Sequence, residues 1–428
     1  MLRSVIAILF LSTSAFTQSH TLKLDDLVSL ALKHSPDLHI SRLDLQGARA
    51  RSKGARSFYL PTLNLSAAGG KQYSKLRHQS SNTLDLLTGT LTASQLIYDF
   101  GKTSGQIEAA DEQMLSQNAL VYQHVADKIL QVKQLYYEIL KAQGIVEVQH
   151  KNVTLQLQQL KRAQRYLKAG IKTIIDVTDA KVRLEQAKRD LENARYRIRL
   201  LHAQLEQIIG TTPYGGDYKL YNPHPDISGV SHKLPKVHTP LSQLEQFAYR
   251  HRPLLESSQH QIKSAKAILK STRGDYLPSL SVGGDYTTQK VDDTLAGFLP
   301  QTQSHIALNL RWNLFSGFRT DAAVEEAKIG VLKSASQQQN IRLGIRRQVD
   351  EAYISLRQSY ENITLNKAIT DSAHKKLYQA QKRYENGLSD FIELQNAQQD
   401  YINALTTLVN SYYDYYIALA QLDYAVGR

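Results

Sequence analysis

The sequence predicts a mostly α-helical protein with a smaller β part, built from a duplicated helix–strand–strand–helix module. Three observations predict this fold class. The two halves repeat at a constant offset of 217 residues, apolar residues follow helical spacing over very long stretches, and a few short segments alternate apolar with polar residues. The period is far longer than that of a solenoid, so the repeated unit has the size of a domain.

The repeat is most visible in two short segments, "YLPTLNL" from Tyr59 and "YLPSLSV" from Tyr276. Other identical pairs at the same offset include Ala31 and Ala248, His34 and His251, Pro36 and Pro253, Gly170 and Gly387, and Gly210 and Gly427. We assign the first repeat to residues 20–210 and the second to 241–428. Residues 211–240 hold five of the ten prolines and read as an irregular connector.

Residues 1–19 have the features of a secretory signal peptide. Arg3 precedes an apolar run over residues 5–16, which is too short to span a membrane as a helix. We expect cleavage after residue 15 or after residue 19, and a buried N-terminal helix is the alternative. No later stretch reaches the roughly eighteen apolar residues of a membrane-spanning helix, so any membrane crossing must use strands.

The elements expected within each repeat follow one order. Residues 22–58 carry helical spacing, and Pro61 ends that helix because proline lacks an amide proton and favours extended geometry before it. The first repeat then continues with strands at about 62–73 and 88–98, a long helix at about 102–168 and a return helix at about 174–209. The second continues with strands at about 279–291 and 303–315, a long helix at about 319–385 and a return helix at about 391–426.

Alternation in the last predicted strand is the clearest β signal. Ile306, Leu308 and Leu310 alternate with the polar residues His305 and Asn309. This pattern is typical of a strand with lipid on one face and water on the other, and a strand of a soluble sandwich gives the same pattern.

The long helix carries a heptad pattern. Between Val125 and Leu167, mostly apolar residues recur at steps of four and three, which predicts packing along the whole helix. At ~1.5 Å per residue the helix would be roughly 100 Å long. The first helix and the return helix together match that length, so we expect them to stack end to end beside it.

Four strands per chain cannot close a barrel. In lipid, each unpaired amide at an open edge costs several kcal/mol, so a membrane-spanning form requires more than one chain. Two chains would give eight strands with a filled interior, whereas three would give twelve strands with the beginning of a lumen.

The ordered set of motifs resembles the TolC family of outer-membrane efflux proteins. It comprises the two YLP junctions, the "LFSGFR" segment from Leu314, and the glycine turns "YLKAGIKTIIDVTDA" and "YENGLSDFIELQNA". The resemblance implies a homotrimer in which a twelve-stranded outer-membrane β-barrel continues into a long periplasmic α-helical coiled-coil barrel. It also implies a passive exit duct of a tripartite efflux or type I secretion system, served by a periplasmic adaptor and an inner-membrane pump.

Acidic residues directly after the two glycine turns are the candidate gate. Asp176 and Asp179 follow the first turn, and Glu393 and Asn396 follow the second, each pair on one helix face. Threefold symmetry would convert an inward carboxylate into a ring that favours cations. The resemblance places the constricting acids at Glu393 and Asn396, so one carboxylate of that pair is replaced by an amide. The alternative is that these acids only stabilise a helix N-terminus.

The resemblance further implies a latch and a docking surface at the same turns. In the latch, Asp176 bonds the hydroxyl of Tyr384. The residues expected to contact the adaptor are Gly170, Gly387, Leu388 and Ser389. Ser389 stands where relatives carry a basic residue that takes part in the latch. The alternative for the two glycines is that they only end helices.

Other classes of function receive little support from the residues. The basic residues are scattered singly rather than clustered in a nucleic-acid-binding module, despite the net charge of +13, so we expect no nucleic-acid partner. The chain has no cysteine, no HExxH and no GxSxG motif, so we expect no catalysis, cofactor or metal. An exported coiled-coil scaffold or adhesin is the alternative function. The sequence does not distinguish small toxic compounds from an exported protein as cargo.

Overall fold

The computed structural model describes residues 20–74, 82–171, 173–223, 234–235, 237–291 and 301–428. The expected signal peptide at 1–19 lies outside these residues. The chain forms two compact, mostly helical units. The first comprises Met1–Pro36, Ala126–Thr239 and Asp350–Ala425, and the second comprises Asp37–Val125, Pro240–Val349 and Val426–Arg428. Each unit therefore combines segments of both repeats. Within the described residues, no helix has the length and apolar character needed to cross a membrane.

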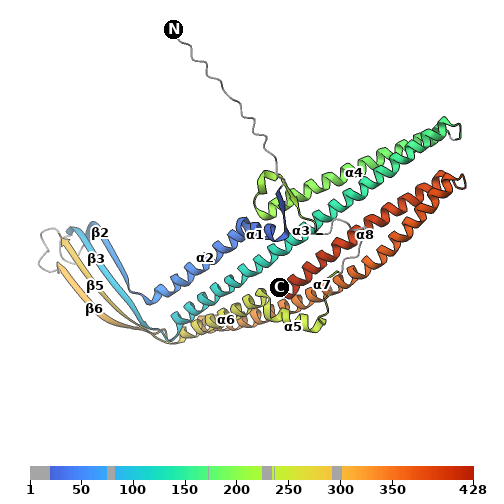
Figure 1. The fold of residues 1–428 in the computed structure, drawn as a ribbon. Coiled ribbons are helices and arrows are strands. Elements are labelled where there is room, and N and C mark those ends of the chain that lie inside the picture. Colours follow the sequence, from blue (N-terminus) through green and yellow to red (C-terminus); the bar gives the residue numbers. More distant parts are fainter. Residues whose placement is uncertain (1–19, 75–81, 172, 224–233, 236, 292–300) are drawn as a thin grey trace, which may run out of the picture. The chain divides into compact units, whose positions relative to one another are not determined.

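The two halves of the chain contain the same elements in nearly the same order (Figure 1). The first half consists of β1 (His20–Leu22), α1 (Leu24–His34), α2 (Pro36–Arg56), β2 (Thr62–Ser74), β3 (Asn82–Tyr98), α3 (Lys102–Lys168) and α4 (Ile174–Ile209). The second half consists of β4 (Tyr218–Leu220), α5 (Leu241–His251), α6 (Pro253–Arg273), β5 (Ser279–Val291), β6 (Thr302–Arg311), α7 (Arg319–Glu385) and α8 (Phe391–Val426). Each of the four helices α1 to α4 has a counterpart of equal length that begins 217 residues later.

The single helix predicted over residues 22–58 is wrong, because the chain breaks it into α1 and α2. Ser35 is extended at the break, with φ −60° and ψ 122°. Pro36 is the cause, since proline disfavours the helical conformation in the residue before it. Arg252 is extended in the same way before Pro253, with φ −76° and ψ 117°.

Two predicted strand boundaries are also wrong, and strand pairing explains both. β3 begins at Asn82 rather than near residue 88, because its first residues pair with the far end of β2, for example Asp85 with Lys71. β6 ends at Arg311 rather than at residue 315, because Arg311 already pairs with Ser279, the first residue of β5. Beyond that pair β5 offers no further partner.

The two YLP junctions are built by the same hydrogen bonds. The backbone N–H of Leu60 donates to Ser57 O at 2.9 Å, and that of Leu277 donates to Gly274 O at 3.0 Å. A side chain from the end of the hairpin, within β3 or directly after β6, then reaches each tyrosine carbonyl: Gln95 Nε2 donates to Tyr59 O at 2.5 Å. The indole of Trp312, 217 residues after Gln95, donates to Tyr276 O at 3.0 Å. Each helix-to-strand change is thereby tied to its own hairpin.

The second unit contains a four-stranded antiparallel sheet in the order β2-β3-β5-β6. Directly opposed residues lie on the same face of such a sheet, so the register defines two faces. In the described part of the chain, the outer edges of β2 and β6 have no partner strand. The sheet is therefore open at both sides.

One face of the sheet, which we call the apolar face, is occupied mainly by aliphatic residues and glycine. Its large members are well exposed, with Leu65 at 79% and Ile306 at 84%. It comprises Leu63, Leu65, Ala67, Leu87, Leu91, Ala93, Leu280, Val282, Tyr286, Ile306, Leu308 and Leu310. The only charged residues that the register places on this face are Lys71, Asp85 and Lys290, at its end away from the helices.

The opposite face, the polar face, carries hydroxyl, amide and charged side chains. It comprises Thr62, Asn64, Ser66, Thr88, Thr90, Thr92, Ser94, Ser281, Asp285, Thr287, His305, Asn309 and Arg311. Some of these residues bond across strands: the hydroxyls of Thr90 and Thr287 lie 3.2 Å apart, and His305 Nδ1 lies 3.5 Å from Asp285 Oδ1. The register also places Leu86 and Leu96 on the polar face and Gln95 and Thr288 on the apolar face. The sheet thus separates apolar from polar side chains over most of its area.

The first unit has a core that is rich in tyrosine. Helices α1, α3, α4 and α8 contribute to it, with Tyr136, Tyr412 and Tyr413 almost fully buried. Burial raises the pKa of Tyr413 to about 12, and Asn222 donates a hydrogen bond to its hydroxyl. Strands β1 and β4 pair in parallel at the edge of this core. That pairing was not predicted, because three-residue strands carry no periodicity of their own.

The predicted heptad seam of α3 is confirmed only in part. Val132, Tyr136 and Ile139 are buried as expected, but His150 and Gln164 are exposed. The buried residues in that later part are Val148, Gln156, Gln159 and Ala163. A straight α-helix drifts by about 20° per heptad against a strict seven-residue repeat, so the buried stripe moves away from the predicted positions.

A glycine sets the close approach of α3 and α6 in the second unit. A Cβ at Gly105 would lie 2.7 Å from Ser271 N and 2.8 Å from Ala267 O, both backbone atoms. We expect Gly105→Ala to destabilise the protein by about 1–3 kcal/mol, because the two helices must separate. The matched control is Gly330→Ala in α7, where nothing lies within 4 Å; it should stabilise by up to about 1 kcal/mol. Chemical unfolding of the purified variants measures both, and equal shifts would contradict this packing.

Candidate functional site

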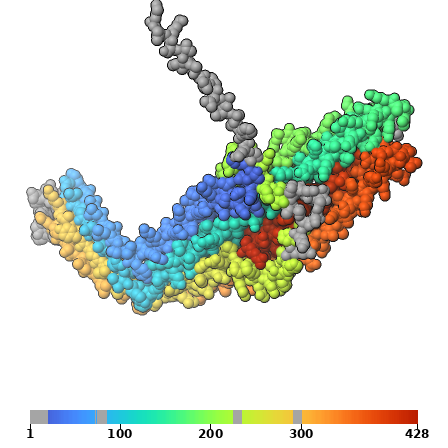
Figure 2. All heavy atoms as spheres, in the orientation of Figure 1, coloured from blue at the N-terminus to red at the C-terminus, as the bar shows by residue number. Residues whose placement is uncertain are grey.

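Two helical hairpins end side by side in the first unit, α3–α4 and α7–α8 (Figure 1, Figure 2). Each reverses through a glycine with left-handed backbone, φ 72° at Gly170 and φ 70° at Gly387. Gly170 N–H donates to Leu167 O and Ile171 N–H to Tyr166 O, and the second hairpin repeats both bonds. This pair of bonds is the Schellman motif, which satisfies the last carbonyls of a helix. The glycines therefore end α3 and α7.

Asp176 is held in the first turn of α4. Its Oδ2 accepts hydrogen bonds from the backbone N–H and the hydroxyl of Thr173, both at 2.9 Å. The Thr173 side chain in turn accepts from the backbone at Asp176, which completes a capping box. Asp179 is exposed one turn later. Asp176 thus stabilises the start of α4, as the alternative reading of these acids proposed.

The second hairpin uses a different acid for the same purpose. Asp390 precedes α8, and its carboxylate accepts the backbone N–H of Glu393 at 2.8 Å. Asp390 was not among the predicted residues, although aspartate directly before a helix is a strong capping signal. Glu393 itself lies 3.3 Å from the Arg383 guanidinium, with 41% of its side chain exposed. Asn396 is exposed on the same helix face.

Tyr384 is buried between the two hairpins. Its ring lies 6.2 Å from the ring of Tyr166 on α3 and 6.2 Å from that of Phe391 on α8. Burial raises the pKa of the Tyr384 hydroxyl, and the negative charge of Asp176 raises it further. The structure therefore brings Asp176 and Tyr384 into one site, and the hydrogen bond between them stays a prediction.

Among the contacts that join the hairpins near their ends are two polar pairs that were not expected. Arg162 on α3 lies 3.2 Å from Glu385 on α7, with only 14% of the arginine side chain exposed. Gln156 Nε2 on α3 donates to Gln398 Oε1 on α8 at 3.5 Å, and both residues are buried. These pairs depend on which helix faces meet, which the sequence alone does not specify.

Apolar side chains crowd the exposed surface of the hairpin ends. Five of them are between 63% and 68% exposed: Ile171, Ile174, Ile175, Leu388 and Ile392. The hydroxyl of Ser389 beside them is buried and makes no hydrogen bond within the described residues. A surface of this kind is typical of a contact with another protein.

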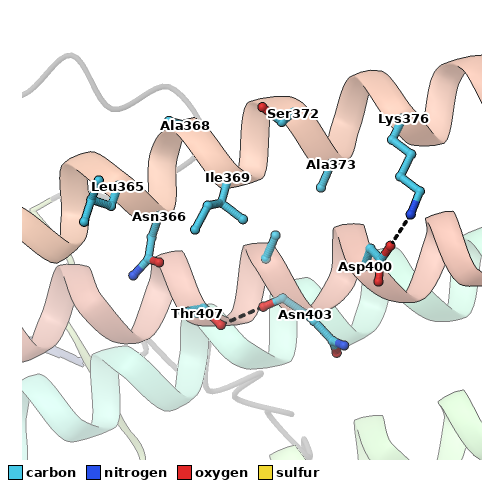
Figure 3. A pocket seen from close by; sticks show the side chains of 11 residues that line it. Leu365, Asn366, Ala368, Ile369, Ser372, Ala373, Lys376, Asp400, Asn403 and Thr407 are labelled. Carbon is cyan, nitrogen blue, oxygen red and sulfur yellow. Dashed lines mark hydrogen bonds and ion pairs between the residues drawn. The ribbon is translucent and has the colours of Figure 1, made fainter.

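A groove of about 820 Å³ runs between α7 and α8 in the same unit (Figure 3). Leu365 and Ile369 line it and are 61% and 54% exposed. Lys376 and Asp400 form an ion pair of 2.6 Å at one end. The groove is long, shallow and mostly apolar, so its shape suits a helix better than a small molecule. Among the described residues, no group of three acidic or histidine side chains could hold a metal.

Comparison with known proteins identifies the class. Residues 27–211 and 244–428 each match the model of the outer membrane efflux protein family, so the chain belongs to that family. The two matches are 217 residues apart, the offset of the internal repeat.

Its relatives include proteins named for outer-membrane efflux and for protein secretion. The chain is 26% identical to protein CyaE of Bordetella pertussis over 395 aligned residues. This alignment covers 89% of the chain and 80% of CyaE. It is 24% identical to the alkaline protease secretion protein AprF of Pseudomonas aeruginosa, in an alignment that covers 93% of this chain and 83% of that protein. Among solved structures, a membrane protein of P. aeruginosa superposes with a TM-score of 0.82 at 20% identity, covering 94% of this chain and 93% of that one.

Proposed function

We propose that three copies of this chain form the outer-membrane exit duct of a tripartite efflux or type I secretion system. Cargo passes through it passively, delivered by an inner-membrane pump and a periplasmic adaptor. The observation that carries the proposal is the open four-stranded sheet with one apolar and one polar face, in a member of the outer membrane efflux protein family. The chain would be exported by a signal peptide at residues 1–19 and reside in the outer membrane, with a large periplasmic portion.

The sheet supports a trimer. Its unpaired outer edges on β2 and β6 invite pairing with other copies, and lipid makes that pairing obligatory. Twelve strands leave a lumen lined by the polar face, with the apolar face in contact with lipid. Eight strands from a dimer would leave an interior filled by side chains and no passage.

The helices support the same assembly. The groove with Leu365 and Ile369 on α7 is an apolar surface that a helix of a neighbouring copy would cover (Figure 3). Three chains arranged in this way would form a hollow coiled-coil cylinder in the periplasm, with the hairpin ends at its mouth.

At the mouth, the carboxylates of Asp176, Asp179 and Glu393 would produce a ring of negative potential. Its strength is reduced in this chain, because Asn396 is neutral and Glu393 is paired with Arg383. The exposed apolar side chains beside Gly170, Gly387, Leu388 and Ser389 form the surface on which the adaptor would dock.

The alternative of a coiled-coil scaffold or adhesin is less well supported. A soluble head would have to cover an apolar face on all four strands, whereas residues such as Leu65, Ile306 and Leu308 are exposed. Either small compounds or a secreted protein would suit a passive duct, since the pump selects the cargo.

The first experiment is planar-bilayer conductance of the purified oligomer, wild type beside Glu393→Ala. We expect a small cation-preferring pore whose preference falls in the variant, because a ring of three carboxylates is removed. Asp371→Ala is the control, since it removes an exposed carboxylate of α7 away from the hairpin end. If neither wild type nor variant conducts, the duct is refuted and the scaffold remains.

The latch between Asp176 and Tyr384 has its own test. We expect Tyr384→Phe to increase pore conductance several-fold, because the hydroxyl that would hold the two hairpins together is lost while the buried ring is kept. Tyr378→Phe is the matched control on the same helix, where the ring is 61% exposed. An unchanged conductance in Tyr384→Phe would eliminate the latch.

Two adjacent residues of β6 test the orientation of the sheet. Leu308→Arg places a charge on the apolar face and is expected to cost about 2–4 kcal/mol if that face meets lipid. Asn309→Arg places the same charge on the polar face and should be tolerated. The measurement is the fraction of each variant recovered as trimer in the outer-membrane fraction. Equal recovery of the two variants would contradict the orientation.

A further inference from the structure

The polar face ends in a cavity of about 380 Å³ where the sheet meets the helices of the second unit. Three basic residues line it: Lys102 and Arg319 are the first residues of α3 and α7, and Arg311 is the last residue of β6. Arg311 pairs with Ser279, which also lines the cavity, so the register places this cavity on the polar side of the sheet.

The acidic groups of this region are already engaged. Asp99 is buried, and its carboxylate accepts the backbone N–H of Thr103 at 2.7 Å. Asp275 lies 2.5 Å from the ammonium of Lys102. Asp321, next along α7, accepts the hydroxyl of Tyr276 at 2.8 Å.

The two arginines are therefore the groups available to a ligand. Among the described residues, no carboxylate forms an ion pair with the guanidinium of Arg311 or Arg319, and both residues are exposed. A guanidinium presents a planar set of donors that matches a carboxylate or a phosphate. The nearby N-termini of α3 and α7 add to the positive potential of the two arginines.

The set of charges around the cavity belongs to the second repeat. The position 217 residues before Arg311 is Ser94, and the one before Asp275 is Phe58, so the first repeat cannot form the same set of charges. Gly274 makes the arrangement possible in the second repeat, because a Cβ there would lie 3.0 Å from the backbone nitrogen of Lys102.

We propose that Arg311 and Arg319 bind an oxyanion, a carboxylate or phosphate group carried by the cargo, on the polar face of the sheet. This inference rests on the proposed duct, in which that face lines the lumen and three copies bring six arginines to one level. Cargo would then meet acidic side chains at the periplasmic mouth and basic side chains at the entrance to the barrel.

The test is calorimetric binding of inorganic pyrophosphate to the purified full-length oligomer. We expect wild type to bind, and Arg311→Gln/Arg319→Gln to bind about tenfold more weakly or worse, because two charge-assisted interactions are lost. Arg49→Gln/Arg51→Gln removes the same charge from exposed positions of α2 and should leave binding unchanged. Arg311→Lys/Arg319→Lys keeps the charge without the planar donors, so its affinity for pyrophosphate should lie between those of wild type and the double glutamine variant. Absence of wild-type binding, or equal loss in the Arg49/Arg51 control, would overturn the site.

Single-channel recording then places the site in the lumen. Pyrophosphate is expected to block the wild-type pore, with a half-blocking concentration about tenfold higher in the Arg311/Arg319 variant. A conducting pore that binds pyrophosphate without being blocked would overturn the role in cargo passage. If pyrophosphate binds but the oligomer never conducts, the anion site stands and the proposed duct fails.

Discussion

Two unpaired strand edges impose the main constraint on this protein. The outer edges of β2 and β6 present backbone N–H and C=O groups without a partner strand in the described part of the chain. In water these groups bind solvent, but in a membrane each would cost several kcal/mol. A sheet whose large apolar residues lie mostly on one face cannot avoid this cost by folding on itself, because four strands are too few to close. In lipid the sheet would therefore require strands from further chains, and the proposed trimer meets that requirement.

The connection between helix and strand must then be made four times per chain, and the two repeats solve it with related devices. The side chains of Gln95 and Trp312 differ in chemistry, yet both donate to the carbonyl of the tyrosine that begins a YLP segment. On the return from strand to helix, Asp99 caps α3 and Ser316 occupies the same place before α7, where its Oγ accepts the backbone N–H of Thr320 at 3.2 Å. Both residues accept the backbone N–H of the residue four positions later, but Asp99 is charged and Ser316 is neutral. At the same junction, the first repeat has Ser94 and Lys102 where the second has Arg311 and Arg319.

The sequence was sufficient for elements that are set by local chemistry and insufficient for those that are set by pairing. The bounds of the long helices agree with the predicted ones, because glycine ends them and a capping residue precedes the return helices. The start of β3 was misplaced, because it depends on β2 as a partner. Near the hairpin ends, the sequence indicated acidic groups at Asp176 and Glu393, but it did not predict which residues they contact. Glu393 meets Arg383 of its own hairpin, and Arg162 meets Glu385 of the other, and only the packed helices decide those contacts.

The distribution of contacts within the first unit indicates which part of it can open. Around Tyr136, Tyr412 and Tyr413 the helices share a continuous apolar core, whose separation would expose large buried side chains to water. At the hairpin ends, the contacts between hairpins include the polar pairs Arg162–Glu385 and Gln156–Gln398, and Tyr166 of α3, which packs against a small apolar cluster of α7 and α8 around Tyr384. An exposed ion pair contributes only about 0–1 kcal/mol, and even the partly buried pair of Arg162 and Glu385 must offset its own desolvation. Regions held by few buried apolar contacts open at the lowest free energy, so movement of the hairpin ends need not disturb the tyrosine core. A gate placed there can respond to a docking partner while the rest of the unit stays folded.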